Sequence, residues 1–280
     1  MLCYAIYLNS HINYWGSVDN IEDNPLQISI EGQYSQVNQL VKFKEDKLVV
    51  ASMNDQLSVI STDGKDLVNK TNVSAAPKYV GIIKETNMLV AQLTNESVVI
   101  LEQVEENKEP KVIIKDGSSC VAVHPFKMEI AVGFIDNSVR VYSVANNGSD
   151  ISIKEKYHVN VNRRDVSSLA YSPNGEYLAS GDKAGKIYLL NSEDGSIITN
   201  QWVYHTAAVN SMSWFSDSKR MVSGSLDSSI YVWQVNKPSE HSCVLQAHPL
   251  GVSGVHTVGE NIIVSCGSNS IIKKWEIKEI

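Results

Sequence analysis

Short apolar runs alternate with small polar residues along almost the whole chain. Runs of five to seven mainly apolar residues recur between clusters of Asn, Asp, Gly and Ser, and the period of an amphipathic helix is almost absent. This pattern predicts many short antiparallel strands joined by tight turns. One stretch shows the unit clearly, with predicted strands d, a, b and c at 197–204, 209–214, 220–225 and 230–233.

The four-strand unit recurs at an interval close to that of a β-propeller blade, which takes about 40–45 residues. Predicted strand c ends at seven positions, 41 to 48 residues apart: Trp15, Ile60, Leu101, Tyr142, Leu190, Trp233 and Trp275. Six positions earlier stands a small polar residue in most units: Asn9, Asn54, Asn95, Asp136, Asp227 and Asn269, with Ala184 as the exception. The length of 280 residues is consistent with seven units.

These units resemble WD40 repeats, most clearly at 205–233. In that family a His before strand a, a Ser or Thr in strand b, an Asp in the b–c turn and the strand-c Trp form a hydrogen-bonded tetrad. The resemblance places tetrads at His205, Ser223 (or Ser225), Asp227 and Trp233, and at His248, Ser265, Asn269 and Trp275. A buried Trp N–H and a buried carboxylate both need such partners. In the blades where Ile60, Leu101 and Leu190 replace the Trp, we expect the stability of the blade to depend more on apolar packing than on the tetrad.

The period and the resemblance together predict an all-β fold, a seven-bladed WD40 β-propeller with an incomplete first blade. Residues 1–280 are expected to form one domain, with a partial blade at 1–15 and full blades at 16–60, 61–101, 102–142, 143–190, 191–233 and 234–275. The partial blade has only strand b, at about 2–8, and strand c, at 11–15. Roughly 25–30 residues of a blade are missing upstream, so we expect a fragment or a shortened gene product.

Five stretches carry a closer resemblance in the same chain order: SHINYW at 10–15, VAVHP at 121–125, VSSLAYSPNG at 166–175, YVW at 231–233 and IKKWEI at 272–277. They resemble the C-terminal propeller of the actin-interacting protein 1 family, whose members are cofactors of cofilin. The resemblance implies a non-enzymatic module that binds cofilin-decorated actin filaments and promotes their disassembly. It implies this only in part, because the family's N-terminal propeller contributes to the same surface.

Partner binding in propellers usually uses the face that carries the d–a and b–c loops. The residue before each tetrad-Asp position points to that face: Met53, Thr94, Ile135, Lys183, Leu226 and Ser268. Three of these are large and apolar, which favours a partner site, although packing against neighbouring loops is the alternative. Arg163 and Arg164, in the 160–165 loop of the same face, either meet an acidic partner such as actin or belong to a solvated loop.

Charge and hydropathy narrow the functional classes. The net charge is −7 and the basic residues form no long cluster, which disfavours general, sequence-independent binding to nucleic acid. No run approaches the roughly 18 apolar residues of a membrane span, and the N-terminal residues lack the basic start of a signal peptide. With the resemblance, this predicts a cytoplasmic protein of the actin cytoskeleton, with no nucleic-acid or membrane partner.

No motif for catalysis or metal binding is present in the sequence. Cys3, Cys120, Cys243 and Cys266 are scattered without a CxxC pair, which predicts buried reduced thiols. HExxH, GxSxG and the phosphate-binding GxxxxGK[ST] are absent. We therefore expect no catalytic residue, metal, cofactor or small-molecule substrate. A scaffold of another multiprotein complex remains the alternative function, and a hydrolase that uses Ser223 or Ser225 is a third hypothesis.

Overall fold

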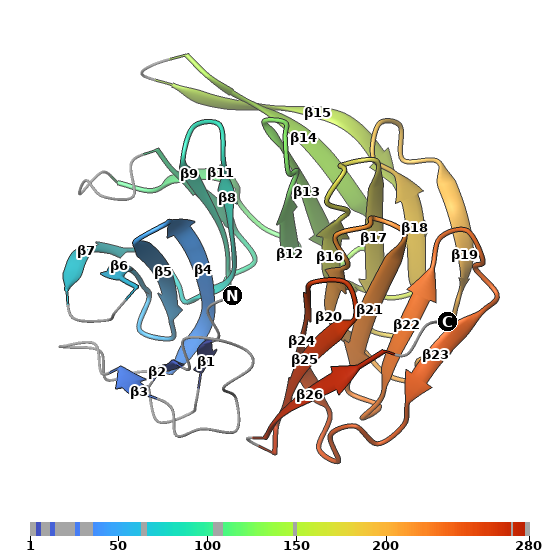
Figure 1. The fold of residues 1–280 in the computed structure, drawn as a ribbon. Helices are drawn as coiled ribbons and strands as arrows, with labels where there is room; N and C mark the ends of the chain where they lie inside the picture. Colours follow the sequence, from blue (N-terminus) through green and yellow to red (C-terminus); the bar gives the residue numbers. More distant parts are fainter. Residues whose placement is uncertain are drawn as a thin grey trace. The chain divides into compact units, whose positions relative to one another are not determined.

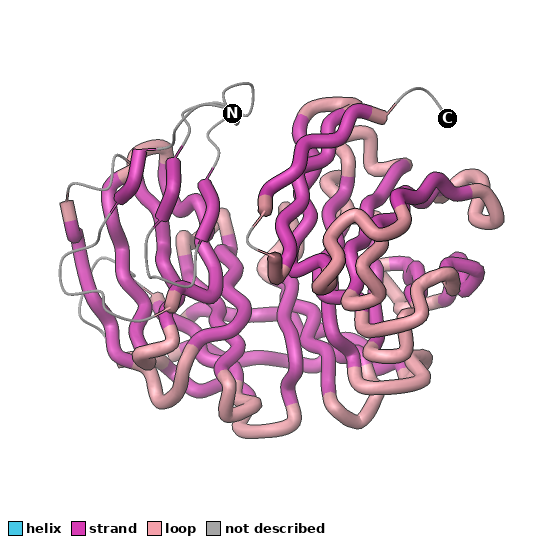
Figure 2. The backbone as a smooth tube through the Cα atoms, turned by 90° about the horizontal axis from the view of Figure 1, so that it is seen from below, coloured by secondary structure: helices cyan, strands magenta, loops and turns pink. Residues whose placement is uncertain are grey.

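The computed structural model describes residues 36–62, 66–102, 109–147, 150–269 and 271–277, and the backbone of three short strands before them. All regular structure in these residues is β-strand (Figures 1 and 2). Among them, no helix is long and apolar enough to cross a membrane. Two compact units make up the chain, Met1–Asp116 and Gly117–Ile280.

The first unit contains three antiparallel sheets. A small sheet joins β1 (Tyr4–Ile6), β2 (Ile12–Tyr14) and β3 (Leu26–Ile28) in that order. The next runs β4 (Val37–Lys44), β5 (Lys47–Ser52), β6 (Gln56–Ser61) and β7 (Leu67–Asn72). The third runs β8 (Pro77–Ile83), β9 (Met88–Leu93), β10 (Val98–Leu101) and β11 (Lys111–Ile114). The inner strands β4 and β8 contact each other.

The second unit contains four sheets of the same kind. The first runs β12 (Ser118–Val123), β13 (Glu129–Phe134), β14 (Val139–Asn146) and β15 (Ile151–Val159). The second runs β16 (Val166–Tyr171), β17 (Tyr177–Asp182), β18 (Ile187–Asn191) and β19 (Ile197–Trp202). The third runs β20 (Val209–Trp214), β21 (Arg220–Ser225), β22 (Ile230–Gln234) and β23 (His241–Val244). The last runs β24 (Val252–Val258), β25 (Ile262–Gly267) and β26 (Ile272–Glu276).

The expected all-β WD40 propeller class is confirmed, but the structure has six blades, so the predicted count of seven is wrong. Five blades have four strands, and the last has three. The N-terminal sheet is built of three-residue strands, and none of its described strands takes the inner position a. Counting strand-c ends overestimates the number of blades because a strand c is counted whether or not an inner strand accompanies it. Asn9 and Trp15 lie outside the described residues.

The best-defined sequence unit has its strands where the pattern predicts them. Strands β20 and β21 begin and end as expected, β22 is one residue longer, and β19 ends at Trp202 rather than at 204. Strand β19 pairs with β18 of the preceding unit, since a short c–d turn keeps the two strands adjacent. Each sheet therefore takes its outer strand from the following sequence unit. The blade boundaries and the single domain stay predictions.

The core lies between successive blades rather than on one face of a single sheet. All six residues of β9 are buried, and β17 and β21 are buried except at their first residue. Within the second unit, neighbouring blades cover both faces of β17 and β21, so burial does not alternate along these strands and includes polar residues such as Ser180 and Ser223. The outer strands β15 and β19 keep exposed positions. The continuous burial of these two central strands is thus a consequence of their place between blades.

Three glycines in strand b allow the blades of the second unit to approach closely. A Cβ atom at Gly133, Gly181 or Gly224 would lie 2.6 Å from Val166 Cγ1, 2.9 Å from Val209 Cβ and 2.4 Å from Val252 Cγ1, respectively. Each of these valines is fully buried and begins strand a of the next blade. The close contact of strand b with the next strand a therefore requires glycine.

The expectation of buried thiols holds for one of the described cysteines. Cys120 is buried, whereas Cys243 and Cys266 are exposed. Cys243 lies in the outer strand β23, where one face is open to solvent. Cys3 lies outside the described residues.

Candidate partner-binding face

The d–a loop and the b–c turn of the β20–β23 blade are held together by the tetrad residues. His205 Nδ1 lies 2.9 Å from Asp227 Oδ2, and His205 Nε2 lies 2.8 Å from Ser223 Oγ. Trp233 Nε1 donates to the same Ser223 Oγ at 2.8 Å. The sequence left Ser223 and Ser225 as alternatives, and the structure places Ser223 in the tetrad. Ser225 Oγ donates instead to the Ala207 carbonyl at 2.9 Å.

The hydrogen bonds of this tetrad have one consistent direction. Trp233 Nε1 can only donate, so Ser223 Oγ accepts from it and gives its own proton to His205 Nε2. His205 then donates from Nδ1 to Asp227, which also accepts the backbone N–H groups of Thr206 and Ser229 at 2.9 Å. Burial alone would raise the pKa of Asp227, but these hydrogen bonds outweigh it and lower the pKa below its usual value.

The last blade repeats the arrangement with an amide in place of the carboxylate. His248 Nδ1 lies 3.1 Å from Asn269 Oδ1, and His248 Nε2 lies 2.8 Å from Ser265 Oγ. Trp275 Nε1 donates to Ser265 Oγ at 2.8 Å. Burial lowers the pKa of His248, which favours the neutral ring that this network needs. The same loop geometry is thus held without a charged group.

Ser223, His205 and Asp227 have the connectivity of a hydrolytic triad, but their surroundings do not suit that chemistry. Ser223 is fully buried and its oxygen already accepts the Trp233 N–H. A nucleophile must be reachable by the substrate carbonyl and must face an oxyanion site. The arrangement therefore favours a role in holding loops over a role in hydrolysis.

A second clamp, made by the backbone, recurs in all six blades. In each blade the residue before the tetrad-Asp position donates its N–H to the carbonyl just ahead of strand a. The six bonds are Met53 to Gln36 at 2.8 Å, Thr94 to Ala76 at 2.8 Å, Ile135 to Gly117 at 3.0 Å, Lys183 to Asp165 at 3.0 Å, Leu226 to Ala208 at 3.0 Å and Ser268 to Gly251 at 3.3 Å. These bonds fix the b–c turn of every blade even where the tetrad has been lost.

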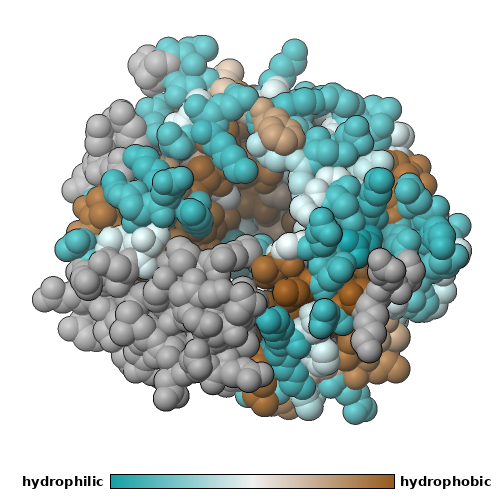
Figure 3. All heavy atoms as spheres, viewed as in Figure 1, coloured by the Kyte–Doolittle hydropathy of each residue, from teal (hydrophilic) through white to brown (hydrophobic). Residues whose placement is uncertain are grey.

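The side chains of these clamp residues reach the surface. Met53, Ile135 and Leu226 are 49%, 46% and 53% exposed. Lys183 is also exposed, but its Nζ pairs with Asp165 Oδ2 at 2.6 Å. Figure 3 shows one side of the molecule, where hydrophilic residues predominate among the described residues and hydrophobic residues reach the surface at separate places. On the clamp residues, a backbone fixed by hydrogen bonds presents exposed apolar side chains, which is typical of anchor residues for a protein partner.

The β16–β19 blade has a tetrad substitute that the sequence pattern missed. Fully buried Asp182 accepts the backbone N–H groups of Ala184 and Lys186 at 2.9 Å on one oxygen and that of Arg163 at 3.0 Å on the other. Asn162 Nδ2 donates to Ser180 Oγ at 3.0 Å, as a tetrad His would contact its Ser. The pattern expects the Asp at position 184, where Ala184 stands, and Asp182 lies two positions earlier.

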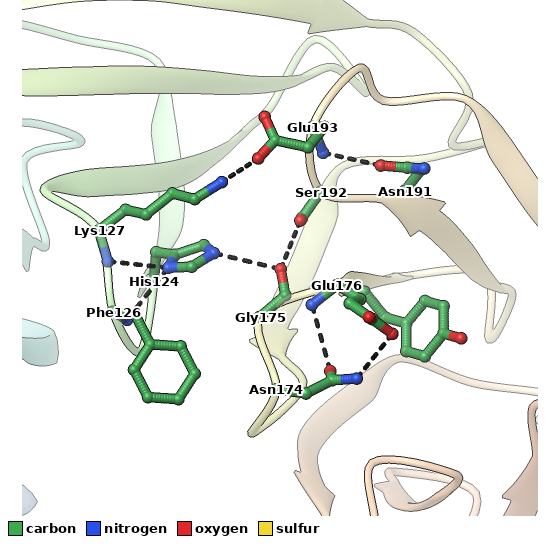
Figure 4. A pocket seen from close by; sticks show the side chains of 10 residues that line it. His124, Phe126, Lys127, Asn174, Gly175, Glu176, Asn191, Ser192 and Glu193 are labelled. Atoms are coloured by element: carbon green, nitrogen blue, oxygen red, sulfur yellow. Dashed lines mark hydrogen bonds and ion pairs between the residues drawn. The ribbon is translucent and has the colours of Figure 1, made fainter.

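A cavity of about 450 Å³ lies at the opposite ends of the strands, among the a–b turns of the β12–β15 and β16–β19 blades and the c–d turn of the β16–β19 blade (Figure 4). His124 Nδ1 accepts the N–H groups of Phe126 and Lys127 at 3.1 and 3.0 Å, so Nε2 carries the proton and donates to Gly175 O at 3.1 Å. Lys127 pairs with Glu193. Burial lowers the pKa of His124, in agreement with a neutral ring. The polar groups here are already partnered, which fits a clamp between two blades.

No group of three His, Cys, Asp or Glu side chains that could hold a metal ion occurs within the residues that the structure describes. On the face that carries the d–a loops and b–c turns (the loop face), the β16–β19 blade carries the cations Arg163, Arg164, Lys183 and Lys186. The two arginines, in the loop before β16, are both exposed. The structure thus brings the predicted Arg163 and Lys183 to the same blade end, with Lys186 as a further cation that the sequence did not single out.

Comparison with known proteins places the repeats in a family. The sequence profile of the anaphase-promoting complex subunit 4 WD40 domain matches residues 146–217. The 66 kDa stress protein of Physarum polycephalum is 32% identical over 273 residues, which are 95% of this chain and 44% of that protein. Actin-interacting protein 1 of Caenorhabditis elegans is 30% identical over 277 residues, 95% of this chain and 43% of that protein.

WD repeat-containing protein 1 of Xenopus tropicalis is 26% identical over 283 residues, 98% of this chain and 44% of that protein. The chain thus spans less than half the length of the curated relatives it matches. The similarity extends over nearly the whole chain, including the blades in which the tetrad has been replaced. The chain is a WD40-repeat protein with homology to actin-interacting protein 1 and WD repeat-containing protein 1.

Proposed function

We propose that the chain is a non-enzymatic actin-binding module that promotes disassembly of cofilin-decorated actin filaments, as the C-terminal half of a two-propeller protein. Its partners are actin filaments and cofilin, and its place is the cytoplasmic actin cytoskeleton. The carrying observation is the similarity over 95% of the chain to a protein named for its interaction with actin. The proposal assigns no cofactor, nucleic acid, membrane or small-molecule substrate to the chain.

The loop face supports this proposal. Ile135 and Leu226 are exposed while their own backbone N–H groups are fixed by hydrogen bonds to the d–a loops. Side chains presented by a rigid backbone lose little conformational freedom on binding, so more of the contact energy appears as affinity. Arg163 and Arg164 add positive charge to the same face of a chain whose net charge is −7. These features suit a large, acidic protein partner.

The proposed activity follows from differential binding. A protein that binds the cofilin-distorted filament more tightly than the regular filament shifts the equilibrium towards the distorted form. A tenfold difference in affinity corresponds to about 1.4 kcal/mol for each bound molecule. No covalent chemistry is required, so the absence of a reachable nucleophile at Ser223 is compatible with the function.

Cosedimentation of the purified chain with actin filaments, with and without saturating cofilin, tests the proposal. The expected result is a larger pelleted fraction with cofilin-decorated filaments than with bare filaments. Equal and negligible pelleting in both conditions, at chain concentrations up to about 50 μM, contradicts it, since specific interfaces bind more tightly than this.

The competing function is a scaffold in another multiprotein complex. The match of 146–217 to the WD40 domain of an anaphase-promoting complex subunit favours it, but that match covers only part of the chain. Affinity purification separates the two functions. Recovery of a stable complex that contains neither actin nor cofilin supports the scaffold.

A further inference from the structure

Two cavities lined by described residues of the second unit differ in whether their charged groups have partners. In the cavity of Figure 4, Lys127 pairs with Glu193. Glu193 also pairs with Lys156, which in turn pairs with Glu129. The cavity on the loop face is different. It is lined by Arg163, Ala184, Gly185, Lys186, Asn200 and Val203 and has a volume of about 490 Å³. Among the described residues, no side chain forms an ion pair with Arg163 or Lys186.

This cavity is held in place by the backbone around it. The carboxylate of Asp182 accepts the N–H groups of Arg163 and Lys186, which fixes the two chain segments that carry the cations. Gly185 comes so close to the next d–a loop that a Cβ atom there would lie 2.4 Å from the His205 carbonyl oxygen. The cavity therefore lies between the fixed b–c turn of one blade and the tetrad loop of the next.

The chemistry of the lining suits a carboxylate-bearing ligand. The Arg163 guanidinium offers several donors, and the Lys186 Nζ lies 4.9 Å from the centre of the Tyr188 ring, still without a carboxylate partner among the described residues. Asn200 adds an amide, and Val203, 48% exposed, adds an apolar wall. A guanidinium without an anion is a strong hydrogen-bond donor to the carboxylate of an Asp or Glu side chain.

The residues around this cavity favour a protein ligand over a nucleic acid or another polyphosphate chain. Asp182 lies beneath the cavity, and Asp165 pairs with Lys183 beside it, so the local excess of positive charge is small. Asn162 links this blade to the turn that contains Ile135, through the Asn137 carbonyl. Exposed apolar side chains flanking a moderately basic cavity are typical of protein interfaces, whereas nucleic-acid sites are strongly basic.

We propose that this cavity binds an acidic segment of a protein partner, with Arg163 and Lys186 contacting its carboxylates and Val203 contacting the aliphatic part of its chain. This goes beyond the proposed function, because it names the ligand chemistry of one cavity and holds for any partner with such a segment. The proposal therefore has a test that needs neither actin nor cofilin.

Fluorescence anisotropy with a fluorescein-labelled, end-capped hexaglutamate peptide tests it. The expected result is saturable binding that weakens as NaCl rises from 50 to 300 mM, as for a partly exposed ionic contact. Arg163→Ala and Lys186→Ala should each raise the dissociation constant at least about threefold, the size of a modest ionic contact. Unchanged far-UV circular dichroism identifies the variants as folded.

Lys219→Ala is the matched control, because Lys219 is an exposed lysine in an a–b turn at the other end of the strands. It removes the same charge and should leave the dissociation constant unchanged. The proposal is overturned if Lys219→Ala weakens binding as much as Lys186→Ala does. It is also overturned if a labelled Gly-Ser peptide binds as well as hexaglutamate, or if a thymidine oligonucleotide of equal charge binds more tightly.

Discussion

The shared oxygen of Ser223 allows a sharp test of the tetrad. Ser223 Oγ accepts the Trp233 N–H and lies 2.8 Å from His205 Nε2, and all three residues are buried. Ser223→Ala removes one atom that serves two groups. It leaves a buried indole donor and a buried imidazole nitrogen without partners, while the methyl side chain still fills most of the space.

The magnitude follows from the number of groups left without a partner. Each such buried group costs about 1–3 kcal/mol, so Ser223→Ala should lower the free energy of unfolding by about 2–6 kcal/mol. In a Trp233→Phe background the indole donor no longer exists, and the same change then costs only about 1–3 kcal/mol. The predicted coupling between the two positions is the difference, about 1–3 kcal/mol.

Urea unfolding followed by far-UV circular dichroism measures all four chains of this cycle without relying on Trp fluorescence. The equivalent pair, Ser265→Ala with Trp275→Phe, is a matched control because the Trp275–Ser265 hydrogen bond is only partly buried, so its loss should cost less. Its coupling should be below about 1 kcal/mol. A coupling near zero at Ser223 and Trp233 would refute the shared-acceptor reasoning.

Three further outcomes follow from the structure. Gly224→Ala should lower stability by about 1–3 kcal/mol through overpacking against Val252 Cγ1, and Val252→Ala in the same chain removes that atom and should recover part of the loss in thermal unfolding. The pKa of Asp227 is lowered in the folded chain, so the contribution of this carboxylate to stability is present at neutral pH and is lost as the pH falls through that lowered value. The free energy of unfolding of Asp227→Asn, measured from pH 7 to 3, should therefore fall less on acidification than that of the unmodified chain. Asp182→Asn replaces an acceptor oxygen with a donor, and the Arg163 amide should exchange with deuterium faster as a result.

The strands and one complete tetrad can be predicted from the sequence of a single repeat, because both depend on residues within that repeat. Alternating hydrophobicity locates β20 and β21 to the residue. The resemblance of residues 205–233 to a WD40 repeat predicts that His205, Asp227 and Trp233 contact one another. A fixed spacing fails in the β16–β19 blade, where Asp182 reaches the same backbone donors from two positions earlier.

Other features depend on contacts between blades, which a single sequence does not encode locally. The need for glycine at 133, 181 and 224 comes from the valine that begins the next strand a, and sequence spacing alone does not show that approach. The ion pair of Lys183 with Asp165 is also absent from the pattern, and it makes Lys183 a weaker candidate for partner contact than the sequence suggested. The count of blades depends on which strands pair, so periodicity predicted one too many.

The central claim is that the loop face of this WD40 chain binds cofilin-decorated actin filaments. The most direct measurement is the pelleting affinity of two matched variants, each of which removes one exposed apolar side chain. Leu226→Ser changes the loop face, and Phe126→Ser changes the opposite ends of the strands, where Phe126 is 61% exposed. Leu226→Ser should weaken pelleting about fivefold or more, as for an interface anchor, with Phe126→Ser unchanged. Equal affinities for Leu226→Ser and the unmodified chain, or a loss confined to Phe126→Ser, would contradict the account.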